Sequence, residues 1–151
     1  MSQMGLYSKI NENTIKANAN TLKKSFENEK KRLDEYKLTL TENIWKANSK
    51  KTFITGIEKI QTDVYEKIEN KLDSLIVVCE RITDYKTAES DYKKAQAELE
   101  KCEAIIASKG STNQETIKEA MGNKSNYINQ MKQYEAIMDN CETEIKQICG
   151  G

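Results

Sequence analysis

Apolar residues recur every three or four positions through most of this chain, which is the period of one face of an α-helix. The first such row predicts an amphipathic helix over residues 8–43, with Glu29 as its one polar interruption. This row consists of Ile15, Ala19, Leu22, Phe26, Leu33, Tyr36 and Leu40.

A second row of apolar residues continues for more than seven heptads without a proline. It predicts one long helix over residues 53–106, about 80 Å in length at a rise of 1.5 Å per residue. The weakest point of this helix is at residues 84–91, where Thr87 and Ser90 favour a kink or a break. The row consists of Phe53, Ile57, Ile60, Val64, Ile68, Leu72, Leu75, Cys79, Ile82, Tyr85, Tyr92, Leu99, Cys102 and Ile106.

Two short segments are expected to reverse the chain. At residues 109–113, Gly110 can end a helix in the left-handed conformation, and Thr112 with Glu115 forms a capping box for the next helix. The other reversal is expected near residues 44–49, where Asn48 or Ser49 can cap the second helix. The third helix carries Ile117, Met121, Tyr127 or Ile128, Met131, Tyr134, Met138, Cys141, Ile145 and Ile148.

These elements predict an all-α fold, an elongated antiparallel helical hairpin or coiled coil of three helices in a single domain of residues 1–151. Short connections make consecutive helices antiparallel neighbours. The first helix should therefore pack on the first half of the second, and the third helix on its second half. Residues 1–90 would form one hairpin, and residues 91–151 a second hairpin that extends it.

Composition narrows the function to protein binding. Acidic and basic residues cancel at 24 each, and Arg32 and Arg81 are the only arginines, so no nucleic-acid partner is expected. The chain has no histidine, and no nucleophile stands beside a base, so we expect neither an enzyme nor a cofactor. The longest apolar run, residues 75–79, is too short for a transmembrane segment, and no cleavable secretory leader is evident near residue 1.

The four cysteines, Cys79, Cys102, Cys141 and Cys149, show no CxxC spacing, so no metal site is expected and buried thiols are the default interpretation. Cys79 and Cys141 lie 31 residues on either side of Gly110, which would place them level in a hairpin. Because helix axes stand 8–10 Å apart, farther than a disulfide prefers, we expect no bond between them.

Trp45 is the only tryptophan and lies at the expected reversal, where a large side chain can plug the open end of a hairpin. The segment Trp45-Lys46-Ala47 also resembles the hallmark of the WXG100 family, small helical hairpins exported by type VII secretion systems. Alanine stands here where the family normally has glycine.

A second feature of that resemblance is a tyrosine followed four residues later by an acidic residue, which in the family forms part of the export signal after the second helix. Tyr85 and Glu89 match this pattern about forty residues beyond the tryptophan. The same spacing recurs at Tyr65 and Glu69 inside a helix. An ordinary core tyrosine beside a solvated glutamate therefore remains an equal interpretation.

The resemblance covers roughly residues 1–90 and implies a homodimer, or a heterodimer with another helical secretion-system protein or toxin targeting domain. The chain would be a type VII substrate, or the export partner of a larger LXG-type effector, secreted without a cleavable signal peptide. A cytoplasmic coiled-coil scaffold or chaperone without an export role is the alternative. In both cases the apolar row would be the core or the partner-binding stripe, represented by Leu22, Phe26, Leu33, Phe53, Ile57, Ile60 and Val64.

Overall fold

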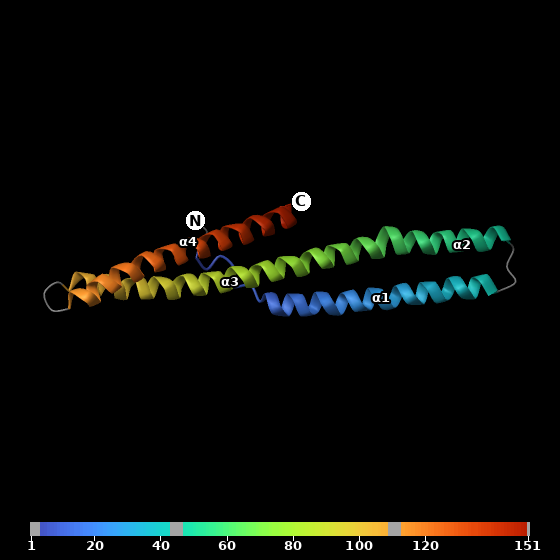
Figure 1. Cartoon of the computed structure of the whole chain (residues 1–151). Coiled ribbons are helices and arrows are strands. Elements are labelled where there is room, and N and C mark those ends of the chain that lie inside the picture. The colour runs from blue at the N-terminus through green and yellow to red at the C-terminus, as the bar shows by residue number, and fades with distance from the viewer. Residues whose placement is uncertain (1–3, 43–46, 109–112, 151) are drawn as a thin grey trace. The chain divides into compact units, whose positions relative to one another are not determined.

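The structure, a computed structural model, describes residues 4–42, 47–108 and 113–150, and it gives only the backbone for residues 40–42 and 47–50. The regular elements of this described part are all helical, which confirms the predicted all-α class (Figure 1). They are α1 (Glu12–Glu42), α2 (Ala47–Ile60), the π-helical turn η1 (Gln61–Tyr65), α3 (Glu66–Ala107) and α4 (Gln114–Gly150).

The chain forms two compact units. Unit 2 comprises residues 11–79, with α1, α2, η1 and the first part of α3. Unit 1 comprises residues 1–10 together with 80–151, so it holds the rest of α3 and all of α4. The boundary expected near residue 90 thus falls after Cys79, because Tyr85 and Ala88 share an apolar cluster with residues of α4.

The start of α1 is set by Asn11. Its side-chain oxygen accepts a hydrogen bond from the N–H of Thr14 at 3.3 Å, and its carbonyl accepts one from the N–H of Ile15 at 3.2 Å. Asparagine is a favoured N-cap because its oxygen satisfies an otherwise unpaired N–H of the first turn. The helix therefore begins at Glu12, later than the expected residue 8, and residues 4–9 form turns.

In unit 2, α1 packs antiparallel to the helix formed by α2, η1 and α3 (Figure 1). The residues of α1 that are not exposed repeat with the heptad spacing of a coiled coil. One of them, Phe26, lies against Tyr65, with ring centroids 5.6 Å apart. The seam begins with Glu12 and then alternates charged with apolar side chains, at Lys16, Ala19, Lys23, Phe26, Lys30, Leu33 and Lys37.

The π-helical turn η1 has a cause in the sequence. From Ile57 the row of seam residues steps by four to Gln61 and again by four to Tyr65, before a step of three to Ile68. Each step of four overshoots a full α-helical turn by about 40°, so the row would wind away from α1. A wider turn absorbs the extra residue and brings the row back to the seam.

The long second helix is confirmed, since residues 47–107 are helical throughout. The break that was one possibility at residues 84–91 is not observed, because α3 continues through them. Thr87 is accommodated by donating its hydroxyl hydrogen to the carbonyl of Thr83 at 3.0 Å. The irregular turn lies at residues 61–65 instead.

In unit 1, α3 and α4 form an antiparallel hairpin whose register is marked by two ion pairs. Arg81 lies 3.5 Å from Glu144, and Glu103 lies 3.6 Å from Lys124. The core of this hairpin again has near-heptad spacing. Its buried apolar residues are Ile82, Tyr85, Ala88, Tyr92, Ala95 and Cys102 on α3, and Ala120, Met138, Cys141 and Ile145 on α4.

The N-cap of α4 is Asn113 and not Thr112. Asn113 accepts a hydrogen bond on its side-chain oxygen from the N–H of Glu115 at 2.9 Å, and its carbonyl accepts one from Ile117. Gly110 and Thr112 themselves lie outside the described residues. The predicted reversal is thus placed correctly between α3 and α4, but its capping residue was assigned one position early.

Candidate functional site

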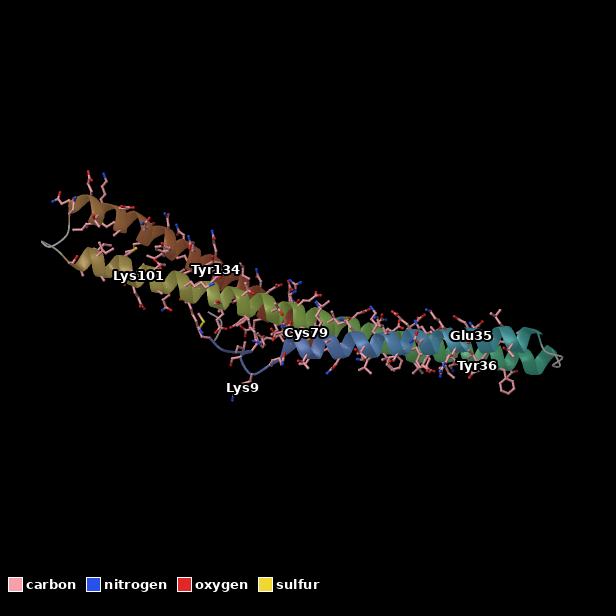
Figure 2. All side chains as sticks on the ribbon, turned by 90° about the horizontal axis from the view of Figure 1, so that it is seen from below. Lys9, Glu35, Tyr36, Cys79, Lys101 and Tyr134 are labelled. Carbon is pink, nitrogen blue, oxygen red and sulfur yellow. The ribbon has the colours of Figure 1, made fainter. Side chains whose placement is uncertain are left out.

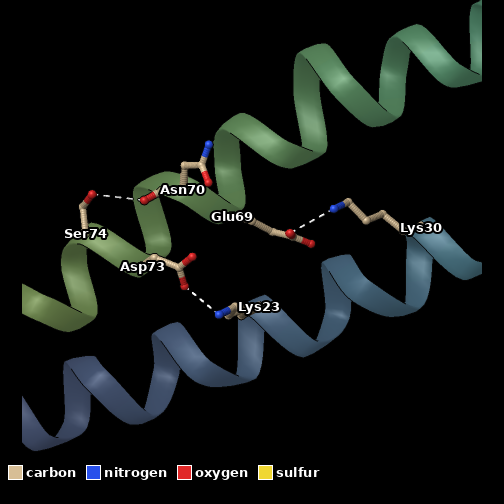
Figure 3. A network of polar contacts seen from close by, with 6 residues as sticks. All are labelled: Lys23, Lys30, Glu69, Asn70, Asp73 and Ser74. Atoms are coloured by element: carbon tan, nitrogen blue, oxygen red, sulfur yellow. Dashed lines mark hydrogen bonds and ion pairs between the residues drawn. The ribbon is translucent and has the colours of Figure 1, made fainter.

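One edge of the unit 2 hairpin is closed by a ladder of polar contacts. Lys23 lies 2.6 Å from Asp73, and Lys30 lies 2.9 Å from Glu69 (Figure 3). The Lys30 and Glu69 side chains are mostly buried, whereas the Lys23 pair is more exposed. The residue number rises along α1 as it falls along α3, so these two ion pairs mark the antiparallel register of the hairpin.

Gln61, the first residue of η1, ties the π-helical turn to α1. Its side-chain NH₂ donates to the carbonyl of Lys30 at 3.2 Å and to the carboxylate of Asp34 at 2.9 Å. Its side-chain oxygen accepts from the ammonium of Lys37 at 3.0 Å. The hydrogen bonds from Gln61 and Lys37 lower the pKa of Asp34, because they stabilise the ionised carboxylate.

The opposite edge of the hairpin is apolar and uncovered. The exposed apolar residues directly precede seam residues, as Leu22 precedes Lys23 and Ile60 precedes Gln61. One residue turns the side chain by about 100° around a helix axis. The two helical arms of the hairpin run antiparallel. A position one residue before a seam residue therefore lies on the same side of the hairpin in both arms.

This surface, which we call the apolar face, carries exposed apolar side chains on both helical arms of the hairpin, interrupted by the exposed residues Glu29, Lys67 and Lys71. The exposed fractions are 51% for Leu22, 54% for Phe53, 45% for Ile60 and 44% for Val64. Its apolar members are Ile15, Leu22, Tyr36, Phe53, Ile60, Val64 and Leu75. By contrast, side chains with nitrogen and oxygen atoms line much of the outside of both hairpins (Figure 2).

The structure thus divides the predicted stripe between two roles. Phe26, Leu33 and Ile57 are half-buried in the seam between the two helical arms. Leu22, Phe53, Ile60 and Val64, by contrast, lie on the apolar face. The sequence pattern identified all of these residues, but the spacing alone could not separate the covered part of a wide apolar stripe from its uncovered part.

The tryptophan motif lies at the end of the unit 2 hairpin. Trp45 is outside the described residues, in the connection between α1 and α2. Ala47 is the first residue of α2, and only its backbone is described. Asn48 and Ser49, expected to cap this helix, instead follow its first residue.

Tyr85 and Glu89 lie within α3, and the helix continues to Ala107. The Tyr85 side chain is fully buried, and Glu89 is 8% exposed. Glu89 accepts a hydrogen bond from the backbone N–H of Gly5 at 2.7 Å and lies 3.3 Å from the ammonium of Lys93. The structure therefore places this pair in the interior of unit 1, with part of its surroundings supplied by residues 4–10.

Residues 4–10, which we call the strap, were not singled out by the sequence pattern. The Tyr7 ring stands edge-on to Tyr85, with centroids 4.9 Å apart and planes at 86°. At its other end, the carbonyl of Ile10 accepts a hydrogen bond from the ammonium of Lys86 at 2.6 Å. A short segment with turns instead of helical periodicity leaves no pattern by which it could have been found.

The phenol of Tyr7 and the thiol of Cys141 both lie in this region, and burial raises the pKa of each. For Tyr7 the carboxylate of Glu142 adds to the increase, and the ammonium of Lys146 opposes it. For Cys141 the carboxylate of Asp84 adds to the increase. Both groups are therefore held in their neutral forms.

The four cysteines are free thiols, and only Cys149 is exposed. The midpoints of the Arg81–Glu144 and Glu103–Lys124 pairs fall at about residue 113. This register places Cys141 beside Tyr85, so the symmetry about Gly110 does not describe the hairpin. Among the described residues, no cluster of acidic or cysteine side chains could hold a metal ion, and no helix is long and apolar enough to span a bilayer.

Comparison of the chain with models of known families, with characterised proteins and with solved structures finds no match.

Proposed function

We propose that this chain is a helical protein-interaction module that docks another helical protein on the apolar face of unit 2. The proposal is carried by the exposed apolar residues of this face, which include Leu22, Ile60 and Val64. Exposed apolar side chains that gather on one side of a protein and are bordered by polar residues often mark an interaction site. An antiparallel hairpin with one apolar side is half of a four-helix bundle, so a second hairpin fits it.

The charges on the apolar face indicate which kind of partner helix would fit it. Lys67 and Lys71 lie between Val64 and Leu75 at helical spacing, so they project from the same side of the helix. Both lysines are exposed, and carboxylates that border the apolar stripe of a partner helix would complement them. We therefore propose a partner helix whose apolar stripe is bordered by carboxylates, with a homodimer as the alternative.

We further propose that type VII secretion is the setting, with the chain as a secreted substrate or as the export partner of a larger LXG-type effector. The support is the resemblance carried by Trp45 and Ala47, together with the position of this motif between two antiparallel amphipathic helices, α1 and α2. A cytoplasmic scaffold or chaperone would use the same docking surface without export, and it is the alternative proposal.

The docking proposal is tested by a matched pair of leucine substitutions on α1. Leu22 lies on the apolar face, whereas Leu38 is 63% exposed and lies one residue after the seam residue Lys37, on the other side of the helix. Light-scattering mass should show a complex of the chain with a helical partner encoded beside it, or with a second copy. Leu22→Glu should dissociate that complex, and Leu38→Glu should leave it intact. Equal effects of the two substitutions would contradict docking on this face.

The export proposal needs a separate test in the native host. The chain should accumulate in the medium, and this accumulation should stop when the type VII machinery is inactivated. Trp45→Ala should also stop it, whereas Leu38→Ala, which alters an exposed residue of α1 outside the apolar face, should retain it. Release that is independent of the machinery would favour the scaffold alternative and would leave the docking proposal standing.

A further inference from the structure

The strap covers the most deeply buried side chains of unit 1 with few contacts of its own. Tyr85 and Met138 are fully buried, and Ala88 and Cys141 complete their cluster. In the strap itself, Met4 and Tyr7 are only partly buried, and Leu6, Ser8 and Lys9 are exposed. A half-exposed segment thus shields a fully buried surface.

The two ends of the strap are held through backbone atoms. The carboxylate of Glu89 accepts from the N–H of Gly5, and the ammonium of Lys86 donates to the carbonyl of Ile10. Every peptide has such groups, so Glu89 and Lys86 can hold a peptide without reading its sequence. One turn of α3 therefore offers an acceptor and a donor suited to a docked chain.

Selectivity comes from the middle of the strap. Gly5 has φ of +73°, a conformation that residues with a side chain rarely adopt. Two residues later, the Tyr7 ring meets Tyr85 edge-on, an orientation favoured by the charge distribution of aromatic rings. The groove consequently suits a peptide with a glycine followed two positions later by an aromatic residue.

The strap has little regular backbone structure of its own, since residues 4–9 form turns. Its own backbone hydrogen bonds are single turns, from Ser8 to Gly5 and from Ile10 to Tyr7. Segments with few buried apolar contacts and short-range hydrogen bonds open locally at much lower cost than helices packed in a core. Opening of the strap should therefore cost less free energy than separation of α3 from α4.

We propose that the groove over Tyr85 and Met138 is a peptide-docking site, that the strap occupies it as a built-in competitor, and that a partner segment with glycine and tyrosine at the same spacing replaces it. This inference rests on unit 1 alone and is independent of docking on the apolar face of unit 2. Strap exchange would couple binding of such a segment to release of residues 4–10.

Oxidation of Met138 by dilute hydrogen peroxide reports whether the groove is covered, with 58% exposed Met121 as an internal reference. The full chain is used, at exposures that oxidise fewer than one methionine per molecule on average. Gly5→Ala strains the strap, and Tyr7→Ala removes its ring. Both should raise Met138 oxidation at least tenfold relative to Met121, whereas Lys9→Ala, at an exposed strap position, should not.

A synthetic peptide of residues 4–11 should then restore Met138 protection when added in excess to the Tyr7→Ala chain. Unchanged oxidation in both strap variants, or no restoration by the peptide, would overturn the proposal. Alkylation of Cys102, which is buried elsewhere in unit 1, monitors opening of the whole hairpin. A parallel rise at Cys102 would also overturn it, because the strap would then be an integral part of the fold.

Discussion

At the scale of single residues, two tyrosines of similar sequence context have opposite surroundings. Tyr36 belongs to the predicted row of α1 and is exposed, whereas Tyr85 belongs to the predicted row of α3 and is fully buried. Heptad spacing marks both as stripe residues. Whether each tyrosine is buried depends on the segments that pack around its helix. For Tyr85 these segments include the strap, and heptad spacing does not reveal them.

Replacing Tyr85 should therefore have a structural effect. Tyr85→Ala should lower the free energy of unfolding by about 3–5 kcal/mol, because it leaves a cavity in a packed core. Tyr36→Ala should change it by less than about 0.5 kcal/mol. Denaturant unfolding of the full chain measures both. A negligible effect of Tyr85→Ala would show that this side chain does not support the core of unit 1.

The strap should respond to alkaline pH through Tyr7. Burial and, to a smaller extent, Glu142 raise the pKa of Tyr7, with lesser contributions of the same sign from Cys141 and Cys149 and an opposing one from Lys146. A raised pKa in the docked state means that the neutral phenol favours docking. That contribution is complete below pH 10.0 and is lost as the pH rises through the raised pKa.

An ultraviolet absorbance titration checks this directly. The difference between the full chain and its Tyr7→Phe variant isolates the titration of this one phenol. We expect a midpoint above the ordinary value of 10.0. A midpoint at or below that value would contradict the docked position of Tyr7 against Tyr85.

At the scale of secondary structure, the sequence predicted the helices well because each carries a sustained apolar row. The ends were less accurate, since Asn11 and Asn113 act as caps where the pattern alone suggested earlier starts. The π-helical turn was not predicted, although the two successive four-residue steps after Ile57 contain its cause. Such steps show that the angular position of the seam residues around the helix must be corrected. They do not show which irregular turn makes the correction.

The mostly buried ion pair between Lys30 and Glu69 should contribute to the stability of the unit 2 hairpin. The Glu69 side chain is mostly buried, and one of its carboxylate oxygens has no hydrogen-bond partner among the described residues. Lys30→Met should therefore lower the free energy of unfolding by about 1–3 kcal/mol, because it leaves a buried carboxylate unpaired. The double variant Lys30→Met with Glu69→Met should recover the loss, because apolar groups pack well at such positions.

Two outcomes would contradict this account of the ladder. One is a double variant that is no more stable than Lys30→Met alone. The other is an equal loss from Lys101→Met, which breaks an exposed pair with Glu98 and should leave unfolding unchanged. Thermal unfolding followed by circular dichroism is sufficient for all three variants.

At the scale of the molecule, the two units are built from similar amphipathic helices but differ in how much of the apolar surface is buried. Unit 1 covers nearly all of its apolar row at least partly, with Tyr92, Cys102 and Met138 among the buried residues and Met121 exposed. Unit 2 buries few side chains, among them Ala19 and Val78. The sequence could not show this division, because both rows have the same period and similar composition. The difference lies in what covers them.

The central claim is that the apolar face of unit 2 contacts another protein. Site-specific photo-crosslinking in the native host tests it most directly, with the crosslinking residue placed at Leu22 or at Leu38 of the full chain. Both positions are exposed leucines of α1 on different sides of the helix. We predict a crosslinked species of defined mass from position 22 and none from position 38. Crosslinking from position 38 alone, or from neither position, would contradict the claim.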